Sequence, residues 1–597
     1  MPSPRDAVRN ARLLLQSVAQ HLVDDPALLV VQVSRRLPFG VRVGAGKALR
    51  RAAELPGGDG LAALGAYMAG DTGAAHQLVA RSPGSRSRIR GEVAVLLGYS
   101  ELLSPASAPT TRARAAWSRG DLSGAVEVLE QAGLDESRQA QRLLSELQLL
   151  SPGYRLQVPE LSRTPPTPIR DGEPLRVLHL LTNSLPHTQS GYSLRSHRIL
   201  TALREQGIDS VALTRTGYPV MVGKMLAADA DVVDGIRYVR SLPSTLPRTQ
   251  EERLLGEVRR ALELVEEVRP HVIHATTNYH NALVAQAVAT AAGLPWVLEV
   301  RGLMEKTWIA SHPDEQAQLA AASSEKAHVV AAREAELASS ADAVVTLSET
   351  MVAELDRRGV APGSIAVVPN GVEASLLREH ATPPAARESL GLTGLHDSFI
   401  VGAVSALVDY EGFDTLLRAV ALLLEDLDTE AGLREGLHVM LAGDGTAAPA
   451  LRALAEELRI SERVTMPGRI PRGEARRWVQ ALDVVVVPRH DVEVSRLVTP
   501  QKPVEALALG RPVIISDLPA LRETVTSESG ELAALMFTAG SARELADRIR
   551  SAYSSRGQAT GAGREIAADR TWSELVRRYG SIYRSALART EEDRTRG

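Results

Sequence analysis

The sequence contains no cysteine in its 597 residues. This absence excludes disulfide bonds, zinc sites with thiolate ligands and cysteine nucleophiles, and it fits a reducing intracellular compartment. The sequence also lacks any apolar run close to the roughly 20 residues that a membrane-spanning helix needs, and it shows no signal-peptide cleavage pattern. We therefore expect a cytoplasmic protein that is neither integral to a membrane nor exported by an obvious signal.

The sequence also lacks a large excess of positive or negative charge. The formal net charge is -4, which gives no indication of extended binding to nucleic acid. The apolar fraction of 44% and the charged fraction of 23% are ordinary for a soluble globular chain. With roughly 100–200 residues per domain, the chain is too long for one hydrophobic core and should hold about three or four domains.

Residues 1–150 are rich in Ala, Leu and Arg at helical spacing, so they are expected to form a helical domain. Within it, AYMAGD at 66–71 recurs as AWSRGD at 116–121, each followed by an Ala-rich apolar segment. The pattern resembles the turn between paired helices of tetratricopeptide-like repeats, where Gly lets the chain turn. A plain helical domain is the favoured interpretation, and a repeat-type module that binds a protein partner is the alternative.

The beginning of the chain is basic. Residues 1–60 hold nine Lys and Arg against five Asp and Glu, so the local net charge is 9 − 5 = +4. A basic amphipathic surface can lie on anionic lipid, which would allow peripheral contact with a membrane. A solvated helix face is the favoured interpretation. The basic residues are Arg5, Arg9, Arg12, Arg35, Arg36, Arg42, Lys47, Arg50 and Arg51.

A change of pattern follows near residue 150. Several prolines, at 152, 159, 165, 166 and 168, disfavour regular structure and predict a linker over 151–173. Beyond it, short Val, Ile and Leu runs alternate with amphipathic segments, the pattern of βαβ units. We expect one Rossmann-like domain over 174–380, a second Rossmann-like domain over 381–570, and a cleft between them for two substrates. A closing helix within 571–597 should fray from Arg589 onward.

The strands of these two sheets can be placed from their apolar runs. We expect the first sheet to contain strands at 175–181, 211–214, 271–275, 296–300, 343–347 and 365–368. We expect the second sheet to contain strands at 399–404, 437–441, 464–466, 484–487 and 512–515.

The most informative segment is 484–517, VVVVPRHDVEVSRLVTPQKPVEALALGRPVIISD. Its four consecutive valines predict a strand covered on both faces, and Arg489 leads from that strand into a loop. A helix should follow, with Thr499 as its cap and Pro500 in its first turn, and it should end at Gly510.

Lys502 and Glu505 are three residues apart and share one face of this predicted helix. A cation near a helix N-terminus suits a diphosphate, and a carboxylate one turn further on can accept hydrogen bonds from two ribose hydroxyls. A surface ion pair is the alternative. The position behind a buried strand, with Arg489 at the strand end, favours half of a nucleotide site.

The segment TPQKPVEALALGRPVI at 499–514 resembles the nucleotide-sugar signature of retaining glycosyltransferases of family 4, which have two Rossmann-like domains in the GT-B arrangement. The similarity spans about residues 174–588, and it includes VPNGV at 368–372, AGDG at 442–445 and PGRI at 467–470. In the first domain, IHA at 273–275 with NYH at 278–280, and EVRGL at 299–303, resemble one branch of that family.

The resemblance implies a metal-independent hexosyltransferase without a cofactor, which moves a sugar from a nucleoside diphosphate sugar to an acceptor hydroxyl with retention. The acceptor would be a glycan or a lipid-linked molecule in cell-surface polysaccharide or glycolipid assembly. The implied donor contacts are Gly443, Gly445, Arg469, Ile470, Arg489, Thr499, Lys502 and Glu505. Acceptor-side candidates are Gly191, Tyr192, Asn278, Glu299 and Arg301. The candidate catalytic residues are His280, Arg489, Lys502 and Glu505.

The chain departs from that family at three positions. Leu497 stands where the family commonly has the first of two glutamates, and Ala406 and Glu411 stand where it often has an Arg and a Lys for the diphosphate. Because an unpaired buried charge costs on the order of several kcal/mol, we hypothesise that Arg489 and Lys502 supply the missing positive charge.

These departures leave alternatives open. Asp491 or Glu493 is a candidate for the missing acid, although loops of this composition are more often simply solvated. A non-catalytic scaffold that binds a nucleotide with a degenerate transferase fold is one rival interpretation. A nucleotide-sugar epimerase on the same two-domain architecture is another.

Overall fold

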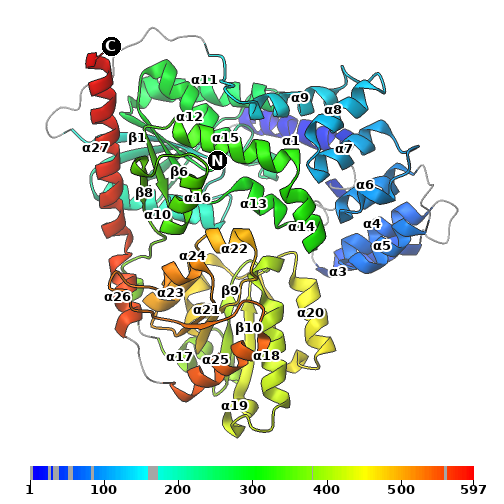
Figure 1. The fold of residues 1–597 in the computed structure, drawn as a ribbon, viewed down its shortest axis with the longest axis vertical. Coiled ribbons are helices and arrows are strands. Elements are labelled where there is room, and N and C mark those ends of the chain that lie inside the picture. Colours follow the sequence, from blue (N-terminus) through cyan, green and yellow to red (C-terminus); the bar gives the residue numbers. More distant parts are fainter. Residues whose placement is uncertain are drawn as a thin grey trace.

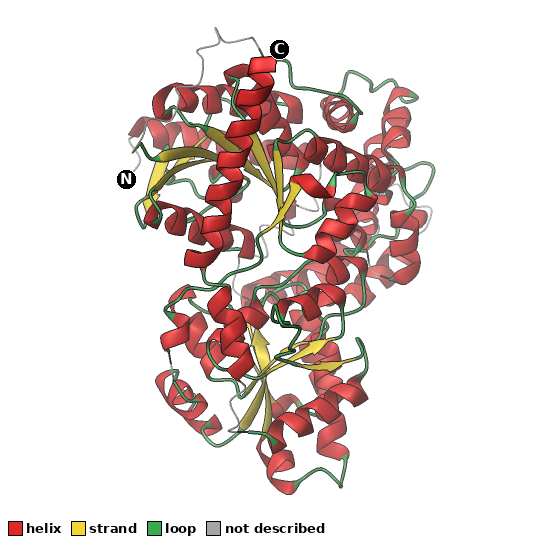
Figure 2. Cartoon of the chain, turned by 60° about the vertical axis from the view of Figure 1, so that its left-hand side comes forward, coloured by secondary structure: helices red, strands yellow, loops and turns green. Residues whose placement is uncertain are grey.

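The computed structural model describes residues 4–24, 29–30, 39–51, 58–81, 87–158, 173–312, 314–379, 381–556 and 561–596. Two α/β domains lie one above the other, and a region of N-terminal helices lies beside them (Figure 1). Figure 2 shows helices on both faces of each sheet, as in doubly wound domains. The expected fold class, two Rossmann-like domains preceded by a helical region, is confirmed.

The two similar hexapeptides of the N-terminal region form equivalent turns. Gly70 and Gly120 each end a helix in the left-handed backbone conformation, with φ of 89° and 87°. The Asp after each glycine caps the next helix by accepting a hydrogen bond from a backbone N–H three residues on. A repeat-type module stays a prediction. The helices are α1 (Pro4–Asp24), α3 (Phe39–Arg50), α4 (Asp59–Ala69), α5 (Thr72–Ala80), α6 (Arg88–Leu97), α7 (Pro109–Arg119), α8 (Leu122–Glu130) and α9 (Arg138–Leu150).

The first α/β domain contains an eight-stranded sheet of order β3-β4-β2-β1-β5-β6-β7-β8, parallel except for β3. Its strands are β1 (Leu175–Leu181), β2 (Ile208–Thr214), β3 (Ala230–Val233), β4 (Ile236–Arg240), β5 (Val272–Thr276), β6 (Trp296–Val300), β7 (Ala343–Thr346) and β8 (Ile365–Val367). Its helices are α10 (Gly191–Glu205), α11 (Gln250–Val268), α12 (Tyr279–Ala292), α13 (Met304–Ile309), α14 (Glu315–Ala322), α15 (Glu325–Ser339) and α16 (Glu349–Arg357). Leu122 and Leu149 of the N-terminal helices belong to the same hydrophobic core as this sheet.

The second α/β domain contains a parallel six-stranded sheet of order β11-β10-β9-β12-β13-β14. Its strands are β9 (Phe399–Val404), β10 (Leu437–Ala442), β11 (Val464–Gly468), β12 (Val484–Val487), β13 (Val513–Ser516) and β14 (Leu535–Phe537). Its helices are α17 (Pro383–Ser389), α18 (Phe413–Glu425), α19 (Ala431–Gly436), α20 (Ala448–Glu457), α21 (Ala475–Gln480), α22 (Glu493–Leu497), α23 (Lys502–Ala508), α24 (Pro519–Thr524), α25 (Ala542–Ser554) and α26 (Gly561–Asp569). Because β9 and β12 are neighbouring parallel strands, the loops that follow them leave the same edge.

The chain passes between the two domains twice, at adjacent places. The first passage follows β8, and the second joins α26 to α27 (Trp572–Arg596), which packs against the first domain (Figure 1). The two passages are hydrogen-bonded to each other, since Val372 N donates to Arg570 O at 2.8 Å and Trp572 N donates to Val372 O at 3.0 Å. α27 is helical to Arg596, and the expected fraying from Arg589 onward stays a prediction.

Some expectations fall outside the described residues. Of the predicted linker, 159–172 and the prolines within it are not described, and neither are Arg35 and Arg36 of the basic N-terminal stretch.

Candidate functional site

The loops after β9 and β12 interlock at the C-terminal edge of the second sheet. His490 N donates to Tyr410 O at 3.0 Å. Gly412 has φ of 72°, and a Cβ there would lie 1.9 Å from Pro488 O, so only glycine permits this approach. These contacts place Glu411, which lies between Tyr410 and Gly412 in the chain, beside Arg489, which follows Pro488.

Glu411 lies between the two predicted cations. Its Oε1 accepts a hydrogen bond from Arg489 Nη2 at 3.0 Å, and its Oε2 accepts one from Lys502 Nζ at 2.5 Å. Burial alone would raise the pKa of Glu411, but Lys502 and Arg489 lower it to about 2, so the carboxylate is ionised at neutral pH. Burial lowers the pKa of Lys502, and the Glu411 charge opposes that effect.

Arg489 is anchored on its other side as well. Its Nη1 donates to Val498 O at 2.8 Å, while its Nε is buried without an acceptor among the described residues. The structure therefore brings Arg489 and Lys502 together, as the charge argument expects, but with Glu411 between them.

Helix α23 begins at Lys502, so the prediction of Thr499 as its cap and Pro500 in its first turn is wrong. Thr499 is instead held by the first interdomain passage: Asn370 Nδ2 donates to Thr499 O at 2.9 Å and lies 3.4 Å from its Oγ1. The predicted end is correct, because Gly510 follows α23 with φ of 68°.

Glu505 faces the other domain. Its Oε1 accepts a hydrogen bond from Arg198 Nη1 of α10 at 2.9 Å. Arg198 Nε also lies 3.3 Å from Glu373 Oε1. Glu505 is therefore at the boundary between the domains. Its ion-pair partner among the described residues is Arg198, whereas that of Lys502 is Glu411.

The site of the missing acid is apolar. Leu497 of α22 is only 8% exposed and belongs to the hydrophobic core of the first domain, so it makes an interdomain contact. The two candidate replacements are engaged in exposed ion pairs, Asp491 with Arg496 and Glu493 with Lys306.

Gly443 and Gly445 permit close approach between backbones after β10. A Cβ on Gly443, whose φ is 146°, would lie 1.7 Å from Ser405 O, and one on Gly445 would lie 2.1 Å from Leu407 O. These glycines shape the loop after β9. In the predicted base-binding segment, Arg469 is exposed and Ile470 is half-buried against the second-domain core.

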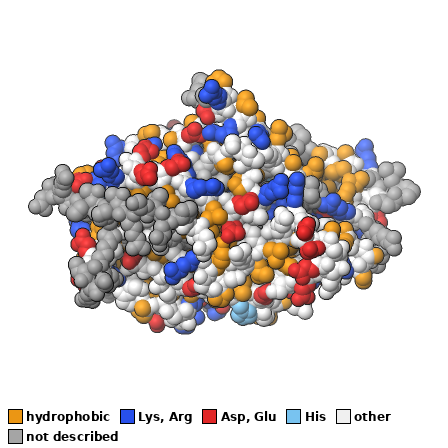
Figure 3. Space-filling model, turned by 90° about the horizontal axis from the view of Figure 1, so that it is seen from above, with side chains coloured by type: hydrophobic (Ala, Val, Ile, Leu, Met, Phe, Trp, Pro, Cys, Tyr) orange, Lys and Arg blue, Asp and Glu red, His pale blue; other side chains and the backbone are white. Residues whose placement is uncertain are grey.

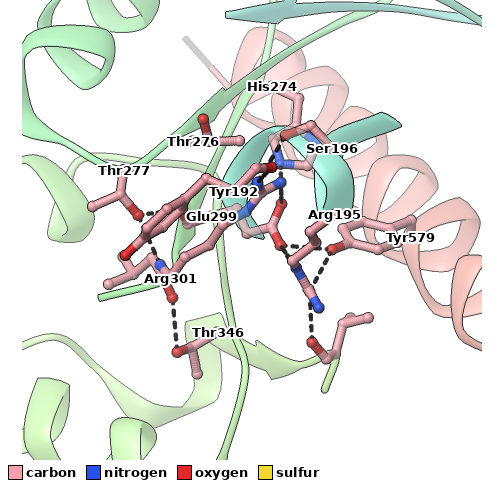
Figure 4. Close-up of polar contacts among 12 residues, drawn as sticks. Tyr192, Arg195, Ser196, His274, Thr276, Thr277, Glu299, Arg301, Thr346 and Tyr579 are labelled. Atoms are coloured by element: carbon pink, nitrogen blue, oxygen red, sulfur yellow. Dashed lines mark hydrogen bonds and ion pairs between the residues drawn. The ribbon is translucent and has the colours of Figure 1, made fainter. Parts of the chain in front are cut away.

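A buried ion cluster centred on Glu299 lies at the end of β6 in the first domain (Figure 4). Its Oε2 accepts a hydrogen bond from Arg301 Nη2 at 2.8 Å, so the two acceptor-side candidates pair with each other. Its Oε1 accepts hydrogen bonds from Arg195 Nε at 3.0 Å and from Tyr579 Oη of α27 at 2.9 Å. Burial would raise the pKa of Glu299, but Arg301 and Arg195 hold it well below its usual range.

Arg195 extends this cluster to the first interdomain passage. It donates to Val368 O at 2.8 Å, to Pro369 O at 2.9 Å and to Asn370 Oδ1 at 3.1 Å. Sequence reasoning missed Arg195 and Arg198. The available signal was their spacing of three residues in the segment directly after the Gly191 loop, which predicts one shared helix face.

Gly191 begins α10 and Tyr192 follows it, half exposed. Tyr192 O accepts a hydrogen bond from Arg301 Nη1 at 3.1 Å. A Cβ on Gly302 would lie 2.8 Å from Tyr192 Oη and 3.7 Å from Val498 of the second domain, so this tyrosine lies near the interdomain boundary.

Asn278 and His280 lie at the start of α12, where Asn278 Oδ1 accepts a hydrogen bond from His280 N at 3.1 Å. The His280 imidazole stacks on Tyr279, and its Nε2 lies 3.4 Å from Glu146 Oε1 of α9. His280 is thus directed at the N-terminal helices, and its assignment to the sugar gains no support from this geometry.

A cavity of about 780 Å³ lies between the domains beside the two passages. Its lining includes Glu349, Pro369, Glu523, Arg570 and Arg578, and it contains none of the predicted donor residues.

Within the described ranges, no group of three His, Asp or Glu side chains is arranged to hold a metal ion. Over the same ranges, none of the helices is both long and apolar enough to cross a membrane. On the face seen from above in Figure 3, basic, acidic and apolar side chains are interspersed.

Two family comparisons match the two α/β domains. Residues 190–371 match the family described as glycosyl transferase 4-like domain, and residues 393–566 match glycosyl transferases group 1. Among curated proteins, the chain is 34% identical over 256 residues to a D-inositol 3-phosphate glycosyltransferase of Streptosporangium roseum, covering 42% of this chain and 56% of that protein. The chain spans about half the length of the curated relatives it matches.

Solved structures share the fold. Sucrose-phosphate synthase from Thermosynechococcus elongatus aligns with a TM-score of 0.54 and 22% identity, covering 69% of this chain and 99% of that chain. Anabaena HepE in complex with UDP and glucose aligns with a TM-score of 0.51 and 16% identity, covering 69% of this chain and 100% of that chain.

Proposed function

We propose, from the premise that this chain belongs to the family 4 glycosyltransferases with the GT-B fold, that it transfers a glycosyl group from a nucleoside diphosphate sugar to an acceptor hydroxyl with retention. The observation that carries the donor assignment is the pair of cations, Arg489 and Lys502, at the C-terminal edge of a parallel sheet. Glu505, one helical turn from Lys502, faces the other domain and is available to ribose hydroxyls once Arg198 releases it.

The chemistry follows from where charge develops. As the glycosidic bond to the donor breaks, the leaving diphosphate gains negative charge, and a guanidinium and an ammonium already in place stabilise it. The leaving phosphate itself would accept the proton of the acceptor hydroxyl, so no separate carboxylate base is required. Leu497 stands where the family commonly has its first glutamate, and its apolar side chain is consistent with a reaction in which the leaving phosphate accepts the proton.

The donor assignment is tested with two variants, Arg489→Ala and Lys502→Ala. A thermal-shift screen against nucleotide sugars first identifies a ligand, since ligands that bind the native state raise the melting temperature. Each variant should then bind that ligand at least about tenfold more weakly, because an ion pair to phosphate is lost. Arg550→Ala, which removes an ion pair with Asp426 elsewhere in the second domain, is the control. Unchanged affinity in both site variants would refute the assignment.

A non-catalytic scaffold is the second candidate, and the ion pairs of Glu411 favour it because they neutralise part of the charge meant for phosphate. Consumption of a radiolabelled nucleotide sugar separates an enzyme from a scaffold. Product analysis separates transfer from epimerisation, the third candidate.

The acceptor and the cellular setting are inferred more broadly. We propose a glycan or lipid-linked acceptor in cell-surface polysaccharide or glycolipid assembly. Contact with the inner membrane face is supported by α1, where Val8, Leu15 and Leu22 are 73%, 68% and 58% exposed along one helix face. A protein partner for the N-terminal helices is a further proposal.

A further inference from the structure

We propose that Glu411 is an internal anion that competes with the donor's phosphate groups for Arg489 and Lys502, and so sets the affinity and selectivity of the donor site. The inference rests on the proposed function, because it assumes that these cations are the phosphate ligands.

The geometry gives Glu411 the contacts that a phosphate would make. Each of its two carboxylate oxygens accepts a hydrogen bond from a different cation, and the residue is only 4% exposed. Guanidinium and ammonium groups bind carboxylate and phosphate oxygens in the same way. The carboxylate therefore occupies one hydrogen-bonding group of each cation and offsets part of their positive charge.

Both cations keep N–H groups beyond those that bind Glu411. Arg489 also donates to Val498 O through Nη1, and its Nε is buried without an acceptor among the described residues. A diphosphate placed there beside an ionised carboxylate would be repelled by it. To bind, the donor must therefore either displace the Glu411 side chain or share the cations with it at a lower affinity.

The backbone position of Glu411 is restrained. The contact of Gly412 with Pro488 O and the hydrogen bond from His490 N to Tyr410 O fix the loop on both sides of it. Displacement is thus confined to its side chain. A ligand that adds other contacts, such as those of a nucleoside, compensates for the broken ion pairs, whereas a bare anion does not.

Glu411→Gln tests this directly, because it removes the negative charge and keeps the side-chain shape. Calorimetric titration with inorganic pyrophosphate and with UDP should show pyrophosphate bound at least about tenfold more tightly than by the unchanged protein, since one repulsive charge is gone. The gain for UDP should be smaller, so the preference for UDP over pyrophosphate falls.

Two further variants distinguish the effect of the Glu411 charge from a general structural effect of substitution. Glu411→Asp keeps the charge and should bind pyrophosphate no more tightly than the unchanged protein. Glu354→Gln removes another buried carboxylate, which binds Arg357 and Arg358 at the C-terminal end of α16 in the other domain, and should change neither affinity. If Glu411→Gln does not fold, as judged by its melting curve, Glu411→Ser takes its place.

The outcomes are distinct. Tighter pyrophosphate binding by the charge-removing variant alone supports the inference, even if UDP binds to no variant, in which case only the proposed donor class fails. Unchanged or weaker pyrophosphate binding overturns the inference, whatever the result for UDP.

Discussion

At the scale of single residues, Glu334 is a carboxylate whose surroundings disfavour its charge. Its Oε1 is buried without a hydrogen-bond partner among the described residues, while its Oε2 accepts one bond from Met304 N at 3.3 Å. Nearby Arg358 is already engaged by Glu305 and Glu354. Burial, followed by repulsion from Glu305, raises the pKa of Glu334 to about 8, so it is protonated in the folded protein at neutral pH.

This raised pKa makes stability depend on pH. In the unfolded chain Glu334 titrates near about 4.3, so the stability associated with its protonated form is full below that pH and is lost as pH rises to about 8. Glu334→Gln does not titrate. Its melting temperature relative to the unchanged protein should therefore increase from pH 5 to pH 8 and level off above. A difference that stays constant across these pH values would contradict the prediction.

Residue types were easier to predict than their partners. Arg489, Lys502 and Glu505 were identified from their positions at a strand end and on a helix face. Their actual partners are Glu411, 78 and 91 positions away from the two cations, and Arg198, 307 positions from Glu505. Nothing local in a sequence encodes such pairings. The pairs of Glu411 depend on how distant segments of the second domain pack, and the Arg198–Glu505 pair depends on how the two domains pack.

At the scale of elements, the α7–α8 turn shows how a repeat-like motif is used. Lys326 N donates to Gly120 O at 2.9 Å, and a Cβ on Gly120 would lie 2.6 Å from Ser324 Cβ and 2.7 Å from the Trp308 ring. The turn is therefore pressed against the first α/β domain. The absence of a side chain, as well as the positive φ, is required at this position.

Gly120→Ala should weaken this docking. The positive φ alone costs about 1 kcal/mol with alanine, and the clash with Ser324 and Trp308 adds to it. Gly133→Ala is the matched control, because Gly133 also has positive φ but nothing lies within 4 Å of its added Cβ. Thermal melting should show a clearly larger loss for Gly120→Ala. Equal losses would mean that the turn is not held against the domain.

The agreement between predicted and observed strands is best where the sequence has several apolar residues close together. Those at 175–181, 296–300, 399–404 and 484–487 agree with β1, β6, β9 and β12 to the residue, because strands that are covered on both faces are rich in apolar residues. β3, β4 and β14 are not among the predicted strands. The β3–β4 hairpin turns at Asp234 and Gly235, both with positive φ, and this Asp-Gly pair is a hairpin signal in the sequence. β14 is only three residues long and lies at a sheet edge.

At the scale of the whole molecule, a carboxylate of one domain binds a helix start in the other. Glu523 of α24 accepts hydrogen bonds from Glu349 N at 2.6 Å, Thr350 N at 3.2 Å and Thr350 Oγ1 at 2.9 Å. Negative charge at a helix N-terminus is stabilising. This contact, with the Arg198–Glu505 pair, holds the domains together in the observed arrangement.

Glu523→Ala should loosen that arrangement. Loss of hydrogen bonds from backbone N–H groups to a carboxylate costs about 1–3 kcal/mol, so the melting temperature should fall. Small-angle scattering without ligand should give a larger radius of gyration. Glu528→Ala, an exposed residue lining the same interdomain cavity, should change neither quantity. Scattering identical to that of the unchanged protein would show that other contacts suffice.

The paired passages of the chain near Val372 and Trp572 have a mechanical consequence. Two covalent connections that are hydrogen-bonded to each other along one edge act as a hinge and restrict sliding and twisting of one domain against the other. Rotation about that hinge is the relative motion that remains, and it would separate the domains most on the side farthest from the hinge.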